Sequence, residues 1–526
     1  MFKKNFFTLL LILIFSCGSI VFSADRPKEY KPNKRCLEWY QKGCAYEEIG
    51  AVEPALEAFK KAVEFDPNYN FALFRLASLY DLKGDYKSSK PIYEQILKNN
   101  VNFYLAYNNM AVIDYSEGNT QKAIERWTLS LRYNPNQSEV YNNLGIVYMA
   151  RQDYEKALQY FNSALQLKSS FIGAASNRAL ALCNLTLYKE AIAQYEKNIK
   201  HFSYEPLVYY NYASFCTSYH NYARAKQLLT TVIKMRNDSA AFYSALALAQ
   251  INAGDPEDAL NNLEKADALS SQHPDVDRDA GIVYLKKGDL QNALLRSNKA
   301  INKKENDPLT AANLGRVYIA LKSPDKALGL WQSFITSFGN NPVVLNARAE
   351  YYIETGNYTA AQNDLNSVLF SAPHEFTALY LTGKLNQALN NDNKAIEYYL
   401  RATEACPYLA ESANNAALIY SAKGDNRKAS EILSKSIGVK PDFPESYANL
   451  GLIYSKMGNE AMAVTTWMQG LTIDGRYAPI YYHLGIASEK LDQKEEALRY
   501  YQTYLRMDPE GKYANDVRKR ISSLFI

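Results

Sequence analysis

Apolar and small residues recur along the chain with the spacing of a helix face. The stretch SEVYNNLGIVYMARQDYEKALQYFNSALQLKSSF, residues 138–171, contains two such sets. The first set is Tyr141, Leu144, Gly145 and Tyr148, at i, i+3, i+4 and i+7. The second set is Ala157, Tyr160, Phe161 and Ala164. This spacing is typical of one face of an α-helix, so the stretch predicts two helices joined by a short break.

The pattern returns every 34 residues. Steps of 34 from Gly145 meet only Gly or Ala: Gly43, Ala77, Ala111, Gly145, Ala179, Ala213, Ala247, Gly281, Gly315, Ala349, Gly383, Ala417, Gly451 and Gly485. Twelve residues further on, thirteen units carry Ala and one carries Ser. The register never slips. It predicts fourteen tandem units over residues 36–511, in which a small residue gives clearance for the neighbouring helix.

Breaks between the helices carry their own signals. Glycine follows the small residue after seven positions in eight units, where it can supply the left-handed conformation that ends a helix. Prolines such as Pro67, Pro135 and Pro441 recur near the end of the second helix, which they cannot continue. One helix pair cannot bury its apolar face alone, so the units must stack. Three units depart from the pattern at Asp114, Asp277 and Ala413, and we expect looser packing there.

These residues resemble the tetratricopeptide repeat family. The family pattern (aromatic, Leu-Gly, Tyr, Ala, aromatic, Ala, Pro) is matched by Trp39, Gly43, Tyr46, Ala55, Phe59, Ala62 and Pro67. It is matched again by Tyr447, Leu450, Gly451, Tyr454, Ala463 and Trp467. The resemblance covers 476 of the 526 residues. It implies an all-α, right-handed superhelical solenoid of helix-turn-helix units, and residues 512–526 predict a C-terminal capping helix.

The ends and the cysteines bear on localisation. Residues 1–23 contain Lys3 and Lys4 followed by an uncharged apolar run, and this order predicts a cleaved signal peptide. Residues 24–35 are a polar linker. An uncleaved membrane anchor and lipidation at Cys17 are the two alternatives. Of the other five cysteines, Cys36 and Cys44 share a predicted helix and are too far apart to bridge. The expected location is the periplasm or cell envelope of a bacterium, after export.

The charge and the motifs of the sequence limit the classes of function that we expect. Lys plus Arg is 59 and Asp plus Glu is 55, without a block of like charge, so nucleic acid is not an expected partner. The five histidines are not spaced as metal ligands, and no phosphate loop or nucleophile elbow occurs. The repeats leave no room for a catalytic domain. We therefore expect neither enzyme activity, nor a metal, nor another cofactor.

Asparagine is frequent two residues before the small residue, on the first helix of each pair. Seven of fourteen units carry it there: Asn109, Asn143, Asn177, Asn211, Asn313, Asn415 and Asn449. An amide offers a donor and an acceptor together, which suits a peptide backbone. The resemblance implies a related use, since the superhelical domain of the O-linked N-acetylglucosamine transferase carries an asparagine ladder that grips extended peptide. The alternative is that these amides only bond between neighbouring helices.

A second segment of the predicted groove is charged instead. Its residues are Arg278, Lys286, Arg316, Glu350 and Lys384. These features predict a scaffold that binds extended peptides or partner proteins in a groove, with a membrane reached only through a lipid or an uncleaved leader. The alternative is a structural lipoprotein, or an accessory subunit of a secretion, cell-wall or glycosyltransferase complex. An alternative for the charges themselves is a solvated surface.

Overall fold

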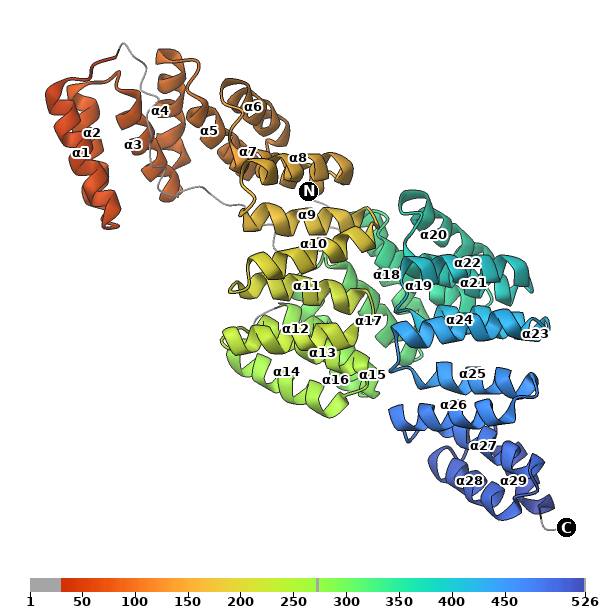
Figure 1. Ribbon diagram of the computed structural model, residues 1–526. Helices are drawn as coiled ribbons and strands as arrows, with labels where there is room; N and C mark the ends of the chain where they lie inside the picture. Colours follow the sequence, from red (N-terminus) through yellow and green to blue (C-terminus); the bar gives the residue numbers. More distant parts are fainter. Residues whose placement is uncertain (1–29, 271–273, 525–526) are drawn as a thin grey trace. The chain divides into compact units, whose positions relative to one another are not determined.

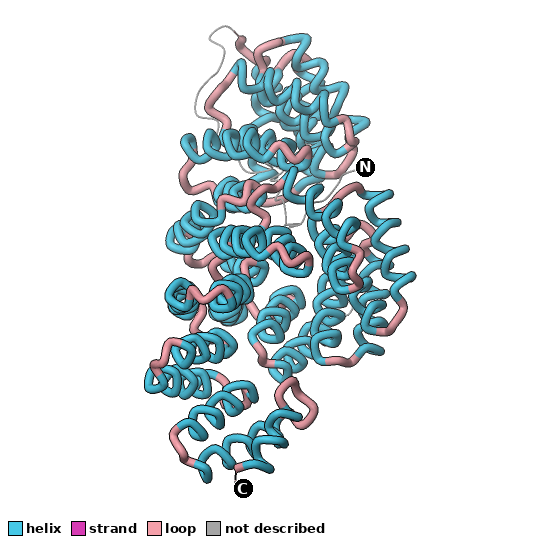
Figure 2. Tube along the Cα trace, turned by 90° about the vertical axis from the view of Figure 1, so that its right-hand side faces the viewer, coloured by secondary structure: helices cyan, strands magenta, loops and turns pink. Residues whose placement is uncertain are grey.

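The computed structural model describes residues 30–270 and 274–524 of the chain. These residues form 29 α-helices joined by short loops, and no strand occurs among them (Figures 1 and 2). The all-α prediction is therefore confirmed. The predicted signal peptide, Cys17 and the first half of the polar linker lie outside the described residues. The fold divides into two compact units, an N-terminal unit that ends at Ser203 and a C-terminal unit that begins at Tyr204.

The N-terminal unit contains five helix pairs. Their bounds are α1 Lys34–Glu48, α2 Val52–Phe65, α3 Asn70–Leu82, α4 Tyr86–Asn99, α5 Tyr104–Ser116, α6 Thr120–Tyr133, α7 Ser138–Ala150, α8 Tyr154–Leu167, α9 Ile172–Asn184 and α10 Tyr188–His201. Odd-numbered helices are the first helices of the repeat units, and even-numbered helices are the second helices.

The C-terminal unit contains nine further pairs and a final helix. Their bounds are α11 Pro206–Ser218, α12 Tyr222–Met235, α13 Ala240–Ala253, α14 Pro256–Ser270, α15 Pro274–Lys287, α16 Leu290–Lys303, α17 Pro308–Ala320, α18 Pro324–Phe338, α19 Pro342–Glu354, α20 Tyr358–Ser371, α21 Phe376–Ala388, α22 Asp392–Ala405, α23 Ala410–Ala422, α24 Asn426–Val439, α25 Pro444–Lys456, α26 Glu460–Ile473, α27 Ala478–Lys490, α28 Lys494–Met507 and α29 Ala514–Ser523. Val517 of α29 is buried against the last pair, beside Tyr501 and Tyr504.

The core is a series of small clusters, each formed where one pair packs against the next. One such cluster joins Leu73, Tyr93 and Met110, which lie on the three successive helices α3, α4 and α5. Another joins Trp331 and Val344 in the C-terminal unit. A chain in which each unit contacts mainly its neighbours gains stability unit by unit. In such an array, equivalent surface residues of the first helices recur every 34 residues.

In most units the small residue makes room for an aromatic ring. A Cβ atom added at Gly145 would lie 2.7 Å from Cδ1 of Phe161, and one added at Gly383 would lie 2.6 Å from Cδ1 of Tyr399. In both cases the ring comes from the second helix of the same pair, sixteen residues later. The clearance predicted for the neighbouring helix is thus filled by a side chain of that helix.

The turn inside each pair has a left-handed residue. The eight glycines at this position have positive φ, as predicted, and so do the six residues that replace glycine: Gln152, Thr186, His220, Lys322, Asn390 and Asp492. A residue with a Cβ is strained in this conformation by about 1–2 kcal/mol. At six turns, the position in the repeat therefore determines the left-handed conformation, although the residue there disfavours it.

Replacing Lys322 by glycine should stabilise the protein by about 1 kcal/mol, because the residue has φ 58° and glycine relieves the strain. The measurement is the urea midpoint of unfolding. Gly356→Ala is the matched control at the same repeat position, where a Cβ would meet no atom within 4 Å. It should destabilise by a similar amount, and a neutral result in both variants would contradict the strain at these turns.

Two of the three units that depart from the repeat pattern are not loosely packed. Asp277, which replaces an aromatic residue, is 1% exposed and lies 2.7 Å from Arg296 Nη1 and 2.6 Å from Lys303 Nζ. Asp114, which replaces a tyrosine, is also 1% exposed and pairs with Arg126 at 2.5 Å. The expectation of looser packing is wrong for both, because an ion pair occupies the site of the missing ring.

Candidate peptide-binding surface

The repeat asparagines lie on first helices, and in the N-terminal unit their amides turn toward other protein groups. Asn109 Nδ2 donates to Tyr93 Oη at 2.9 Å. Asn177 Nδ2 donates to Asn142 Oδ1 of the preceding pair at 3.0 Å. Asn143 is 3% exposed, and its buried Oδ1 has no hydrogen-bond partner among the described residues. The Asn177 bond joins α9 to α7, two neighbouring first helices, whereas the Asn109 bond joins α5 to the second helix α4.

The C-terminal unit repeats this arrangement in part. Asn449 Nδ2 donates to Asn414 Oδ1 at 2.8 Å, and Asn313 Nδ2 donates to Ser297 Oγ at 3.0 Å. Asn415 is half-buried beside the hydroxyls of Tyr380 and Tyr399. Asn211 is half-buried too, and its side chain makes no hydrogen bond to another described residue. Most of the set is thus engaged within the chain, and peptide gripping by the asparagines stays a prediction.

Arg278 belongs to a largely buried cluster of charges rather than to an open surface. Its Nε donates to Asp279 Oδ1 at 2.8 Å, and its Nη1 donates to Asp275 Oδ1 at 2.7 Å. Ser244 Oγ donates to Asp279 Oδ2 at 2.7 Å. Burial raises the pKa of Asp279, which is 2% exposed, while Arg278 opposes that shift. Because its donors are used in this way, we assign Arg278 to the packing of α13 against α15.

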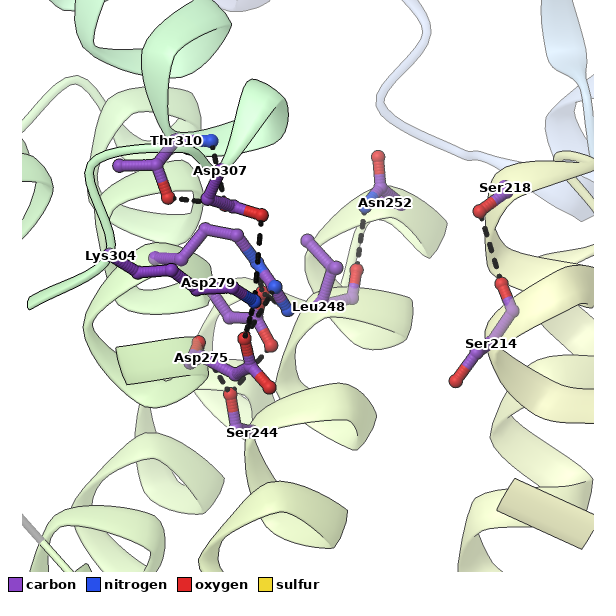
Figure 3. Close-up of polar contacts among 11 residues, drawn as sticks. Ser214, Ser218, Ser244, Leu248, Asn252, Asp275, Asp279, Lys304, Asp307 and Thr310 are labelled. Atoms are coloured by element: carbon purple, nitrogen blue, oxygen red, sulfur yellow. Dashed lines mark hydrogen bonds and ion pairs between the residues drawn. The ribbon is translucent and has the colours of Figure 1, made fainter. Parts of the chain in front are cut away.

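Lys304 and Asp307 complete the cluster on the α17 side. Lys304 Nζ lies 3.8 Å from Asp307 and 3.9 Å from Asp275. Asp307 caps α17, since its Oδ2 accepts from Thr310 N at 3.0 Å and from Thr310 Oγ1 at 2.6 Å. Figure 3 shows these groups on α15 and at the start of α17, with Ser244 on α13. The cluster joins three successive helix pairs.

The other charged residues predicted for the groove remain accessible. Lys286 Nζ donates to Asn252 Oδ1 of the preceding first helix at 2.7 Å. Arg316 and Glu350, on α17 and α19, pair at 3.2 Å with side chains that are 45% and 36% exposed. Lys384 Nζ on α21 lies 6.0 Å from the ring centre of Tyr380. We call Lys286, Arg316, Glu350 and Lys384 the first-helix charges.

Residues far apart in the sequence meet within the C-terminal unit. Tyr219 Oη donates to Ala405 O at 2.9 Å, and Cys406 Sγ donates to Tyr219 O at 3.3 Å. The Tyr219 ring lies 6.0 Å from that of Phe376, edge to face. Lys440 Nζ lies 5.2 Å from the ring centre of Tyr222. The α11–α12 turn therefore packs on segments that are more than 150 residues further along the chain.

This long-range contact brings α15 near α23. The pKa of Lys286 is lowered by the surrounding protein, and Glu411 of α23 opposes that shift. Glu411 Oε2 is buried and has no hydrogen-bond partner among the described residues. The sequence pattern did not identify Glu411, His220 or Lys440 as neighbours of the first-helix charges. The repeat register reveals contacts between adjacent pairs, whereas these contacts join pairs that have three to five other pairs between them.

The cysteines and the length of the helices were also checked against the sequence predictions among the described residues. Their five cysteines are free thiols, four of them buried, as predicted for packed residues. Within residues 30–270 and 274–524, no helix has the length and apolar character needed to cross a membrane.

Comparison with known sequences and structures identifies the repeat. Tetratricopeptide repeat profiles match residues 39–69, 72–100, 138–171, 244–308, 346–410, 410–443, 444–477 and 478–510, more than half of the chain. A 107-residue stretch is 28% identical to Superkiller complex protein 3 of Homo sapiens, and the match spans 18% of this chain and 7% of that protein.

One solved structure shares the fold with a TM-score above 0.5. A chain of the APC/C hetero-tetramer Cut9–Hcn1 matches with a TM-score of 0.52 and 13% identity, over 93% of this chain and 96% of that chain. Yeast Tom70 matches with a TM-score of 0.44 and 14% identity, over 80% of this chain and 96% of that chain. With the unbroken 34-residue register and the profile matches, the chain belongs to the tetratricopeptide repeat family.

Proposed function

We propose that this protein is a non-catalytic scaffold of the cell envelope that binds extended peptides or partner proteins along its first-helix surface. The observation that carries the proposal is the row of accessible charges on successive first helices, from Lys286 through Arg316 and Glu350 to Lys384. Membership of a repeat family whose members act mainly through protein contacts supports a non-catalytic role. The apolar run of residues 6–23 after Lys3 and Lys4 supports export to the envelope.

The first-helix charges suit a peptide of mixed charge. The Arg316–Glu350 pair is about half exposed, and such pairs contribute only about 0–1 kcal/mol to stability. The pair can therefore be exchanged for contacts with a ligand at little cost. Lys384 lies beside the accessible face of Tyr380, so the same place can receive an acidic side chain and an apolar one.

Reversing two of these charges should weaken peptide binding about tenfold or more, because two attractive contacts become repulsive. Peptides of twelve residues would be selected from a random library on the protein without its leader. Their affinities would be measured by fluorescence anisotropy for the wild type and for the Arg316→Glu/Lys384→Glu variant. Lys60→Glu, on the exposed surface of α2, is the control. Equal affinities in all three proteins would reject this surface as the binding site.

Arg278 is unsuitable for this test, since its replacement disturbs the buried cluster. Asn211→Ala and Asn415→Ala test the asparagine prediction instead, because these amides are half-buried and are the least engaged of the set. Loss of binding in either variant, with an unchanged melting temperature, would favour peptide gripping over a purely structural use.

A structural or assembly lipoprotein is the second candidate, favoured by Cys17 in the sequence IFSC. Labelling cells with a palmitate analogue distinguishes it. Label in the wild type that disappears in the Cys17→Ala variant supports lipidation, whereas an unlabelled wild type contradicts it.

A further inference from the structure

A cavity of about 350 Å³ lies between α8, α9 and α10 of the N-terminal unit. No Asp or Glu is among the residues that line it. Apart from the hydroxyl of Ser169, its polar lining consists of amides and basic groups: Asn162, Gln166, Arg178, Gln194, Lys197, Asn198 and His201. The volume is within the range of small-ligand sites. The cavity is separate from the first-helix charges, which are in the C-terminal unit.

Arg178 is a cation without an ionic partner among the described residues. Its Nε donates to Asn162 Oδ1 at 2.6 Å, and its Nη1 donates to Gln194 Oε1. A guanidinium has five N–H donors, and the remaining three make no hydrogen bond to a described residue. Partial burial lowers the pKa of Arg178. The charge is thus held in position by neutral amides.

The amides themselves are fixed. Gln194 is 5% exposed and Asn198 is 2% exposed. Gln194 Nε2 donates to Asn198 Oδ1 at 2.6 Å, and Asn198 Nδ2 donates to Ala175 O at 3.1 Å. Because this network is buried and bonded, the guanidinium of Arg178 is presented to the cavity in one orientation.

The chain contains a second copy of this constellation, five repeat units later, in which the charge is neutralised. Arg348 stands at the register of Arg178, and Asp364 stands at the register of Gln194. Arg348 donates from Nε to Asp364 Oδ2 at 2.8 Å and from Nη2 to Asp364 Oδ1 at 2.7 Å. Gln332, at the register of Asn162, accepts from Arg348 Nη1 at 2.8 Å. An arginine at this repeat position can therefore receive a carboxylate with both oxygens.

The second copy is also filled with apolar atoms. Leu345 stands at the register of Ala175, and Val368 stands at the register of Asn198. Ser367 and Ser371 stand at the registers of Lys197 and His201. The site at Arg178 thus lacks the internal carboxylate and the apolar filling, and it has two additional basic residues at its edge.

We propose that the cavity between α8, α9 and α10 binds a carboxylate-bearing ligand, with Arg178 in the role that Arg348 plays toward Asp364. Lys197 and His201 at the rim add attraction for a second acidic group. The carboxylate can come from a free dicarboxylic acid or from an acidic side chain of a partner protein.

Isothermal titration calorimetry on the protein without its leader tests the proposal, with two probes. One is succinate, and the other is a tetrapeptide with blocked ends and two Asp residues. Binding of succinate alone assigns a small-molecule ligand, and binding of the peptide alone assigns a partner protein. Binding of both establishes the carboxylate site without restricting its source. The absence of heat with either probe overturns the proposal.

Variants copied from the second constellation supply the controls. Gln194→Asp places a carboxylate beside Arg178 and should weaken binding at least about tenfold while raising the melting temperature. Ala175→Leu fills the cavity and should weaken binding even if Gln194→Asp fails to fold. Asp364→Gln frees Arg348 in the filled copy and should create no second site. Unchanged affinity in Gln194→Asp and Ala175→Leu would show that the probes bind elsewhere and would overturn the assignment.

Discussion

Replacing Arg278 by methionine should destabilise the protein by about 3–5 kcal/mol, the cost of removing one partner from a buried ion pair. Arg278 donates to both Asp279 and Asp275, and the Asp279 side chain is only 3% exposed. Without the guanidinium, Asp279 keeps only the hydroxyl of Ser244 as a donor. The measurement is chemical unfolding at pH 7.5, followed by circular dichroism.

The pH dependence of this loss identifies its cause. The unfolded chain ionises Asp279 above pH 3.9 or so, whereas the buried carboxyl of the variant stays protonated to higher pH. The variant should therefore lose the most stability near neutral pH and recover as the pH falls toward 4. A loss that does not vary with pH would indicate a packing defect instead.

A double variant is the matched control. Arg278→Met with Asp279→Asn leaves no buried charge at this pair and places at residue 279 the asparagine that seven other units carry there. Ser244 can still donate to the amide oxygen of that residue. The double variant should recover most of the stability that Arg278→Met loses. A further loss in the double variant would contradict the role assigned to the ion pair.

The helices could be predicted because their signals are local. A small residue every 34 positions and a left-handed turn seven residues later fix each helix pair without reference to distant contacts. The same locality explains why residues such as Gln152 and Lys322 adopt positive φ, since the flanking helices impose the turn. Each unit of the sequence therefore carries enough information to position its own pair.

The candidate site was less predictable because side chains of the same type on different first helices have different partners. Arg316 remains accessible, but Arg278 is taken up by two aspartates. Asn177 and Asn449 donate to the neighbouring first helix, whereas Asn211 does not. Whether a side chain has a partner in the adjacent unit depends on which residue that unit carries nearby. The repeat position of the side chain itself does not reveal that residue.

Contacts that skip several pairs could not be predicted from the register. Tyr219 meets Cys406 and Phe376 because of the accumulated rotation of the pairs between them. Small rotations per unit add up along a solenoid, and no single unit encodes their sum. The proximity of Glu411 to Lys286 follows from that sum.

Acidification should destabilise the C-terminal unit through two histidines, of which His483 is buried and His220 is half-buried. Burial lowers the pKa of His483 to about 4, and nearby Lys512 adds to the shift. Burial also lowers the pKa of His220 to about 4, with Lys440 and Lys286 contributing. The unfolded chain takes up these protons near pH 6.5, and the folded chain does not. Stability is thus complete above pH 6.5 and is lost as the pH falls toward 4, by about 3 kcal/mol for each histidine.

His483→Asn isolates one of these contributions, since asparagine is the usual residue at this repeat position. Other groups act in the opposite sense, because burial raises the pKa of Asp279 and Glu375. The informative quantity is therefore the difference in unfolding free energy between wild type and variant. It should be constant above pH 7 and fall by about 3 kcal/mol between pH 6.5 and 4.

A direct titration completes the test of His483. The imidazole stacks on Trp467 with ring centres 5.5 Å apart, and Tyr482 and Tyr513 cover its edges. With ¹³C-labelled histidine, the His483 resonance is assigned by its absence from His483→Asn and should not shift until the pH approaches 4. A His483 midpoint near 6.5 would show that the ring is solvated, and the predicted loss of stability on acidification would then be absent.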